Sequence, residues 1–86
     1  MGKDTNIQTT FESLSIGMRG TMIYVVQKTL NSIGYEIESD GVFTEEMLTS
    51  VKHFQETRGN LVPNGIVDYM TMKEMDTAFG AYIKNN

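Results

Sequence analysis

The chain has 86 residues, with 7 basic and 11 acidic side chains and a formal net charge of −4 at pH 7. This length suits one small domain and excludes a nucleotide-binding doubly wound sheet or a strand–helix barrel. There is no cysteine, which excludes disulfides, a thiolate metal site and a cysteine nucleophile. The acidic balance and the scattered basic residues argue against nucleic acid or an anionic membrane surface as a partner. No apolar run reaches the roughly 18 residues that span a bilayer.

Residues 1–15 are rich in Thr, Asn and Ser and hold few apolar side chains. We predict that they form a flexible N-terminal lead-in that docks loosely through Phe11 and Leu14. Residues 16–84 carry helical periodicity and are predicted to form the folded domain.

The first predicted helix follows a glycine-rich opening. Apolar side chains recur every three or four residues from Ile23 to Ile33, which predicts one buried helix face. Thr21 is the expected N-cap, and Gly34 is expected to end the helix in a left-handed conformation. The run Tyr24–Val26 suits a strand equally well, so a strand is the alternative at this point.

The second predicted helix follows a tight turn at Asp40-Gly41, a residue pair that tolerates positive φ. Thr44 is a good N-cap, and the two glutamates after it favour the positive end of the helix dipole. Gly59 is expected to end this helix.

The third predicted helix follows a second turn, at Asn64-Gly65, with Asp68 as its N-cap and an apolar face that begins at Met72. A tight turn, two apolar residues, an N-cap and a helix thus occur twice, as a weak internal repeat. These elements predict an all-α fold, a small three-helix bundle with two short turn-and-extended connections that pair briefly.

Several short motifs stand in a specific order. They comprise spaced glycines at 17 and 20, then Val26-Gln27, Gly34-Tyr35, Asp40–Phe43, Phe54-Gln55 and Asn64–Val67. In this order and spacing, residues 17–79 resemble the peptidoglycan-binding domain family, a three-helix module found on many cell-wall hydrolases. The positions that carry the family's structural motif are Gly20, Gln27, Gly34, Gly41, Phe43, Phe54, Gln55 and Gly65.

The resemblance implies a non-catalytic module that binds the stem peptide or the glycan of peptidoglycan and holds an attached catalytic domain against the wall. It also implies an extracytoplasmic, wall-associated setting. The variant looks like the C-terminal module of carboxy-terminal processing serine proteases, because Thr44 and Asp68 stand where the family usually has glycine. These departures and the 7 methionines support an alternative, a protein-interaction or dimerisation module that has lost wall binding.

Four residues near the two turns are candidate ligand contacts: Tyr35, Asp40, Asn64 and Tyr69. The tyrosines either stack on a sugar or stem peptide or pack across a helix end. The two glutamines of the motifs either contact ligand or, as we favour, satisfy backbone groups of the loops, because buried polar groups must be paired.

His53 is the only histidine, and with no cysteine the chain offers too few ligands for a zinc site, so we expect no metal and no cofactor. Ser50 lies three residues before His53, but no acid is placed to orient the imidazole and a helix surface offers no oxyanion hole. We therefore expect no catalytic residue, and His53 is predicted to be a solvated surface side chain.

Overall fold

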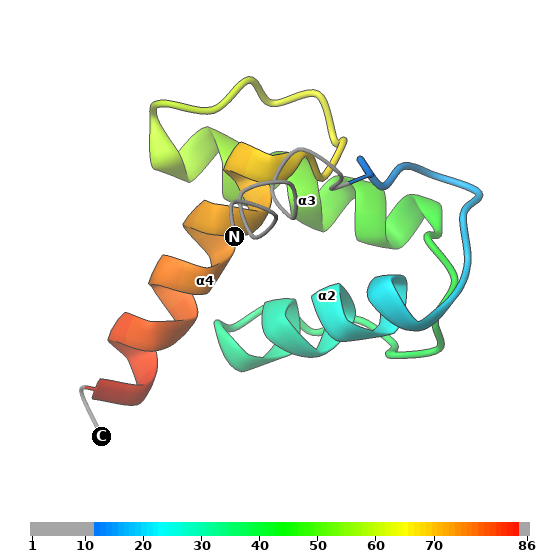
Figure 1. Cartoon of the computed structure of the whole chain (residues 1–86), viewed down its shortest axis with the longest axis horizontal. Helices are drawn as coiled ribbons and strands as arrows, with labels where there is room; N and C mark the ends of the chain where they lie inside the picture. The colour runs from blue at the N-terminus through cyan, green and yellow to red at the C-terminus, as the bar shows by residue number, and fades with distance from the viewer. Residues whose placement is uncertain (1–11, 85–86) are drawn as a thin grey trace, which may run out of the picture.

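The computed structural model describes residues 12–84, which form three helices (Figure 1). The helices are α2 (Thr21–Ser32), α3 (Glu45–Arg58) and α4 (Tyr69–Lys84). In Figure 1, α2 and α3 lie side by side, and α4 runs obliquely past them and packs against α2. Residues 12–84 contain isolated β-bridges and no longer strand, so the predicted all-α three-helix bundle is confirmed. The run Tyr24–Val26 is helical, and the strand alternative is wrong.

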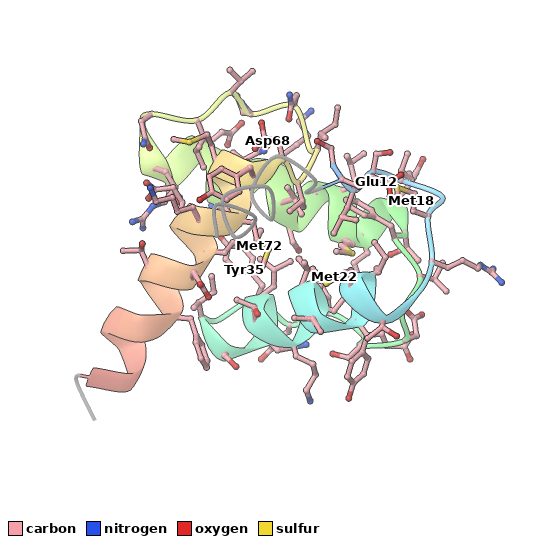
Figure 2. All side chains as sticks on the ribbon, in the orientation of Figure 1. Glu12, Met18, Met22, Tyr35, Asp68 and Met72 are labelled. Atoms are coloured by element: carbon pink, nitrogen blue, oxygen red, sulfur yellow. The ribbon has the colours of Figure 1, made fainter. Side chains whose placement is uncertain are left out.

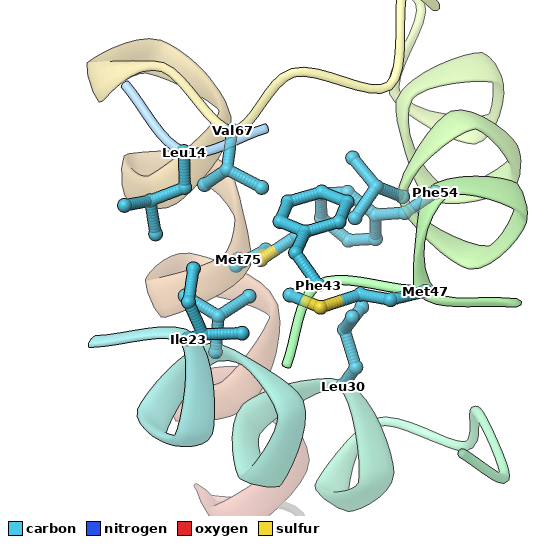
Figure 3. Close-up of a cluster of buried hydrophobic side chains, with 10 residues drawn as sticks. Leu14, Ile23, Leu30, Phe43, Met47, Phe54, Val67 and Met75 are labelled. Carbon is cyan, nitrogen blue, oxygen red and sulfur yellow. The ribbon is translucent and has the colours of Figure 1, made fainter. Parts of the chain in front are cut away.

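One hydrophobic core joins the three helices and both connections (Figure 3). Each helix contributes the stripe that its three-and-four spacing predicts, and each connection contributes the apolar residue that precedes its N-cap. Burying a side chain of this size contributes about 1.5–3 kcal/mol. The buried apolar residues are Leu14, Ile23, Val26, Leu30, Phe43, Met47, Val51, Phe54, Val67 and Met75.

Side-chain caps begin two of the helices as predicted. Thr44 Oγ1 accepts a hydrogen bond from the Met47 N–H at 3.3 Å, and Asp68 Oδ1 accepts one from the Thr71 N–H at 2.9 Å. The predicted N-cap of the first helix is wrong, because Thr21 is already helical and Gly20 occupies the cap position without a side-chain bond. The physical reason is that the Gly20 N–H pairs with a carbonyl of the first connection, so extended pairing continues up to the helix.

Gly34 ends α2 in the predicted way. Its φ of 111° lets the chain reverse, and the Tyr35 N–H then bonds the Leu30 carbonyl at 2.9 Å while the Gly34 N–H bonds the Asn31 carbonyl at 3.2 Å. This pair of bonds is the Schellman arrangement. It returns Tyr35 to the core, where the ring packs half-buried. Gly59 likewise ends α3 with a left-handed φ of 72°.

Residues 14–20 connect the two halves of the fold. Leu14 exchanges both backbone hydrogen bonds with Val67, at 2.9 and 2.8 Å. Further along, Arg19 forms a bridge with Val42 of the first connection. Both connections therefore pair briefly, but each pairs with this segment, which was not predicted as their partner.

Leu14 is 5% exposed and thus belongs to the packed domain, although the sequence placed it in the lead-in. Phe11, the other predicted docking residue, lies outside the described residues.

Within the described range, none of the helices combines the length and apolar character that a bilayer crossing requires.

Candidate functional site

The first connection is held by one buried glutamine of α2. Gln27 is 1% exposed, and its Oε1 accepts the Gly41 N–H at 2.8 Å. Its Nε2 donates to the Val42 carbonyl at 2.9 Å and to Asp40 Oδ1 at 3.1 Å. Because every one of these partners belongs to the same turn, the amide fixes the shape of the loop. We call this arrangement the first clasp.

The second connection is held in the same way by α3, through Gln55. Its Oε1 accepts the Gly65 N–H at 2.8 Å, and its Nε2 donates to the Ile66 carbonyl at 2.9 Å and to Asn64 Oδ1 at 3.3 Å. A fourth bond, from Nε2 to Thr71 Oγ1 at 3.0 Å, has no counterpart in the first clasp. We call this arrangement the second clasp.

The clasps confirm that the two glutamines satisfy backbone groups of the loops. They also show that Asp40 and Asn64 serve the fold, because Oδ1 of each accepts the N–H two residues onward, at 3.0 and 2.9 Å. The hydrogen bond from the Val42 N–H, followed by that from the Gln27 amide, lowers the pKa of the Asp40 carboxyl. Both side chains lie in exposed turns, and their contact with ligand stays a prediction.

Tyr35 lies against the core in the region where Figure 2 also shows Met72. Its hydroxyl is 2.8 Å from His53 Nδ1 on α3, and the two rings meet edge to face with centroids 5.6 Å apart. Burial raises the pKa of the Tyr35 phenol, and the Arg58 charge acts in the opposite direction. His53 is exposed as predicted, but its contact with Tyr35 was not predicted.

An open depression of about 270 Å³ lies on the outer face of α3. The spacing of its lining residues by three, one and three places them on one side of the helix, opposite the buried stripe. All four offer polar groups. They are Thr49, Lys52, His53 and Glu56.

The depression lies beside two of the four predicted ligand residues. On one side, Tyr35 holds His53. On another, the Asn64-Gly65 turn packs on α3 so closely that a Cβ on Gly65 would overlap Leu48 and would lie 3.1 Å from Lys52 Cγ. None of the four predicted residues lines the depression itself. Asp40 belongs to the first clasp, and Tyr69 is the exposed first residue of α4.

Lys52 and Glu56, the charged residues that line the depression, form no ion pair within residues 12–84. The ion pair of this part of the chain joins Arg58 Nε to Glu74 Oε1 at 3.2 Å, and Asn60 also bonds Glu74. Lys52 and Glu56 therefore face the depression as a cation and an anion one helical turn apart. Among the described side chains, no three His, Cys, Asp or Glu residues gather as a metal ion would require.

The residues that line the depression were not among the predicted ligand contacts, although His53 was predicted to lie at the surface. Their signal was present, since a helix presents positions 49, 52, 53 and 56 on one face. The pattern is typical of any solvated helix face, so periodicity alone does not distinguish it. The distinguishing feature is the packing of two distant loops around that face.

The chain matches a family model described as "Putative peptidoglycan binding domain" over residues 19–75. Among curated proteins, none matches the chain. Solved structures do match it. The SleB N-terminal domain is 26% identical, with a TM-score of 0.75 over 79% of this chain and 93% of that one.

Larger proteins contain a similar domain. A fused Zn-dependent amidase/peptidase/peptidoglycan-binding domain-containing protein from Clostridium acetobutylicum is 30% identical, with a TM-score of 0.70 over 74% of this chain and 28% of that one. The Burkholderia AP3 phage endolysin is 26% identical, with a TM-score of 0.72 over 77% of this chain and 25% of that one. This chain thus spans only about a quarter of either protein. From the family match over most of the three-helix fold, the chain belongs to the peptidoglycan-binding domain family.

Proposed function

We propose that this module binds peptidoglycan at the depression on α3, between Tyr35 and the Asn64-Gly65 turn. The observation that carries the proposal is a polar hollow on a helix face, lined by Lys52, His53 and Glu56. Family membership supports a cell-wall binding module, and the hollow is a place where a polar ligand can make several contacts at once.

Binding at such a site is weak. The depression is open and shallow, and its charged residues are exposed, so each contact competes with water. We expect a dissociation constant in the micromolar to millimolar range for one short ligand. The ligand is repeated along a wall polymer, so its local concentration is high. A module that dissociates therefore rebinds a nearby copy quickly, and the whole protein is retained longer.

The module targets an attached enzyme to the wall. Similar domains occur in a protein described as an amidase/peptidase and in a phage endolysin, both much longer than this chain. Family membership supports a setting outside the cytoplasm, in contact with the cell wall. A wall hydrolase or a carboxy-terminal processing protease as the parent enzyme is our proposal, and the similar structures described above favour the hydrolase.

Co-sedimentation with purified peptidoglycan sacculi tests the function. The wild-type module is expected to sediment with the wall, and the double variant Lys52→Gln/Glu56→Gln to remain largely in the supernatant. The matched control is Lys73→Gln/Glu45→Gln, which removes one charge of each sign elsewhere and is expected to sediment as the wild type does. Absence of sedimentation by the wild type contradicts the proposal.

The alternative, an interaction or dimerisation module, is favoured by exposed apolar side chains. On α2, Met22 is 45% exposed and Val25 is 39% exposed; on α4, Met70 is 47% exposed. Analytical ultracentrifugation distinguishes the two functions. A mass that rises with concentration, in a protein that does not sediment with sacculi, supports the alternative.

A further inference from the structure

We propose that the depression on α3 selects the peptide part of peptidoglycan, by binding a group that carries an ammonium and a carboxylate on one carbon. The free end of an amino-acid side branch in the stem peptide has this chemistry. The inference rests on the proposed function, and it identifies which component of the wall that site recognises.

The lining of the depression carries one charge of each sign. Lys52 and Glu56 stand four residues apart on α3, where side chains lie about 5–6 Å from one another at Cβ. Such a pair commonly closes into an ion pair, but these two make none within residues 12–84. A group with both charges satisfies Lys52 through its carboxylate and Glu56 through its ammonium at the same time.

The side chain of Lys52 is restrained by its neighbours. The Asn64-Gly65 turn packs on its aliphatic stem, as shown by the 3.1 Å between Lys52 Cγ and a Cβ built on Gly65. A lysine normally loses much rotamer freedom when its ammonium binds a partner. Here the second clasp fixes the turn, and the turn restricts the aliphatic part of the Lys52 side chain. Lys52 therefore loses less rotamer entropy when its ammonium binds a ligand.

His53 lies between the two charged residues in the sequence and also lines the depression. The Tyr35 hydroxyl occupies Nδ1 at 2.8 Å, which leaves Nε2 as the ring nitrogen without a partner in the described part of the chain. When Tyr35 donates to Nδ1, Nε2 carries the proton and donates to a ligand oxygen. The imidazole then adds a directional contact to the two charges.

The composition of the lining disfavours a sugar. Among the described side chains, no Phe, Tyr or Trp ring lines the depression, and the Tyr35 ring packs edge to face with His53. A pyranose presents apolar C–H faces that bind best against flat aromatic rings. An acidic module also needs a local cation to accept a carboxylate ligand, and Lys52 is the cation that lines the depression.

Amide chemical-shift titration of the ¹⁵N-labelled module separates the ligand classes. The probes are the tripeptide L-alanyl-γ-D-glutamyl-meso-diaminopimelate, the same peptide amidated at the side-branch carboxylate that shares a carbon with the free ammonium, and tri-N-acetylchitotriose. We expect the tripeptide to shift signals of Lys52, His53, Glu56 and Gly65. The amidated peptide should bind about two- to fivefold more weakly, as expected for one exposed charge contact, and the chitotriose should shift none of these signals.

Single variants test each charge. Lys52→Gln and Glu56→Gln are each expected to raise the dissociation constant for the tripeptide about two- to fivefold, with amide spectra that remain those of the folded domain. Lys73→Gln is the control on α4 and should bind as the wild type does. Equal binding by all three variants overturns the inference.

The outcomes distinguish the inference from the function on which it rests. Sedimentation of the wild type with sacculi, together with shifts caused by chitotriose and none by the tripeptide, overturns the peptide preference alone. Failure to sediment at all removes the proposed function, and the peptide preference with it.

Discussion

Gln27 and Gln55 occupy equivalent places in two successive loop-and-helix units. Each side-chain Oε1 accepts the N–H of a turn glycine at the same distance of 2.8 Å. Each Nε2 donates to the side chain one residue before that glycine and to the carbonyl one residue after it. The internal repeat of the sequence is therefore a repeated hydrogen-bonded device that builds both loops from the helix that precedes them.

Gln55→Ala is expected to lower the free energy of unfolding more than Gln27→Ala does. Either change leaves a turn glycine N–H without its partner, which costs about 1–3 kcal/mol. The change at Gln55 also removes the hydrogen bond from Nε2 to Thr71 Oγ1, which measures 3.0 Å. Thr71 is only 1% exposed, so water does not replace this bond. Urea unfolding followed by circular dichroism measures the difference.

Lys28→Ala, beside Gln27 on the exposed face of α2, is the control and should stay within about 0.5 kcal/mol of the wild type. Equal losses from the two glutamine variants contradict the role given to Thr71.

Asp40→Asn is expected to make the module less sensitive to acid. Hydrogen bonds from the Val42 N–H and the Gln27 amide lower the pKa of Asp40, so its contribution to stability is present above the unfolded value and is lost as the pH falls below about 4. The asparagine variant retains Oδ1 as an acceptor and does not titrate. Melting temperatures of both proteins, measured from neutral pH down to the acid limit, should converge as the pH falls.

The second clasp shows that the substitution suits the fold, because Asn64 occupies the equivalent position there. Parallel acid profiles for the wild type and Asp40→Asn contradict the assignment.

Gly65→Ala is expected to be more destabilising than Gly59→Ala. The two glycines have nearly the same φ, 78° and 72°, so the conformational cost of about 1–2 kcal/mol is common to both. A Cβ at position 59 meets open space, whereas one at 65 overlaps Leu48. Overpacking of this kind adds about 1–3 kcal/mol, which thermal unfolding resolves.

The double variant Gly65→Ala/Leu48→Ala checks the cause of this difference. Removing the obstructing side chain should recover part of the added loss in a double-mutant cycle. No coupling between the two positions argues against steric overlap as the cause.

Tyr35→Phe is expected to cost about 1 kcal/mol of stability, the net value of one hydrogen bond, because the ring keeps its packing and loses its contact with His53. Burial raises the pKa of Tyr35, so the wild type loses this phenol's contribution as the pH rises beyond about 10, and the variant does not. Unfolding at neutral and alkaline pH measures both effects. If Tyr35→Phe lowers the free energy of unfolding more at alkaline pH than at neutral pH, the direction assigned to the pKa shift of Tyr35 is wrong.

Local chemistry made much of the fold predictable. Thr44 and Asp68 are caps whose side chains reach back to the first turn of their own helix, and Gly34 reverses the chain over a few residues. Such features depend on neighbours in the sequence, so the sequence displays them. The role of Gln55 followed from the rule that a buried amide needs partners.

Contacts between distant segments were harder to predict. Leu14 and Val67 pair across most of the chain, and no pattern in either segment specifies the other. The Tyr35 and His53 contact likewise depends on how α2 and α3 pack. The depression was missed for the same reason, because its charged residues look like any solvated face until the Asn64-Gly65 turn is placed beside them.

The second clasp also affects how long the protein lasts chemically. In an Asn-Gly pair the glycine nitrogen attacks the asparagine amide carbon, ammonia leaves, and water opens the cyclic imide to aspartate or isoaspartate. Here the Gly65 N–H is held by Gln55, and Asn64 Oδ1 accepts two hydrogen bonds, so both reacting groups are restrained. The bonds that shape the loop are therefore expected to slow deamidation at this Asn-Gly pair. An aspartate formed at position 64 would occupy the position that Asp40 has in the first clasp, where the carboxylate accepts the N–H two residues onward. The aspartate product of the reaction is therefore expected to preserve the fold.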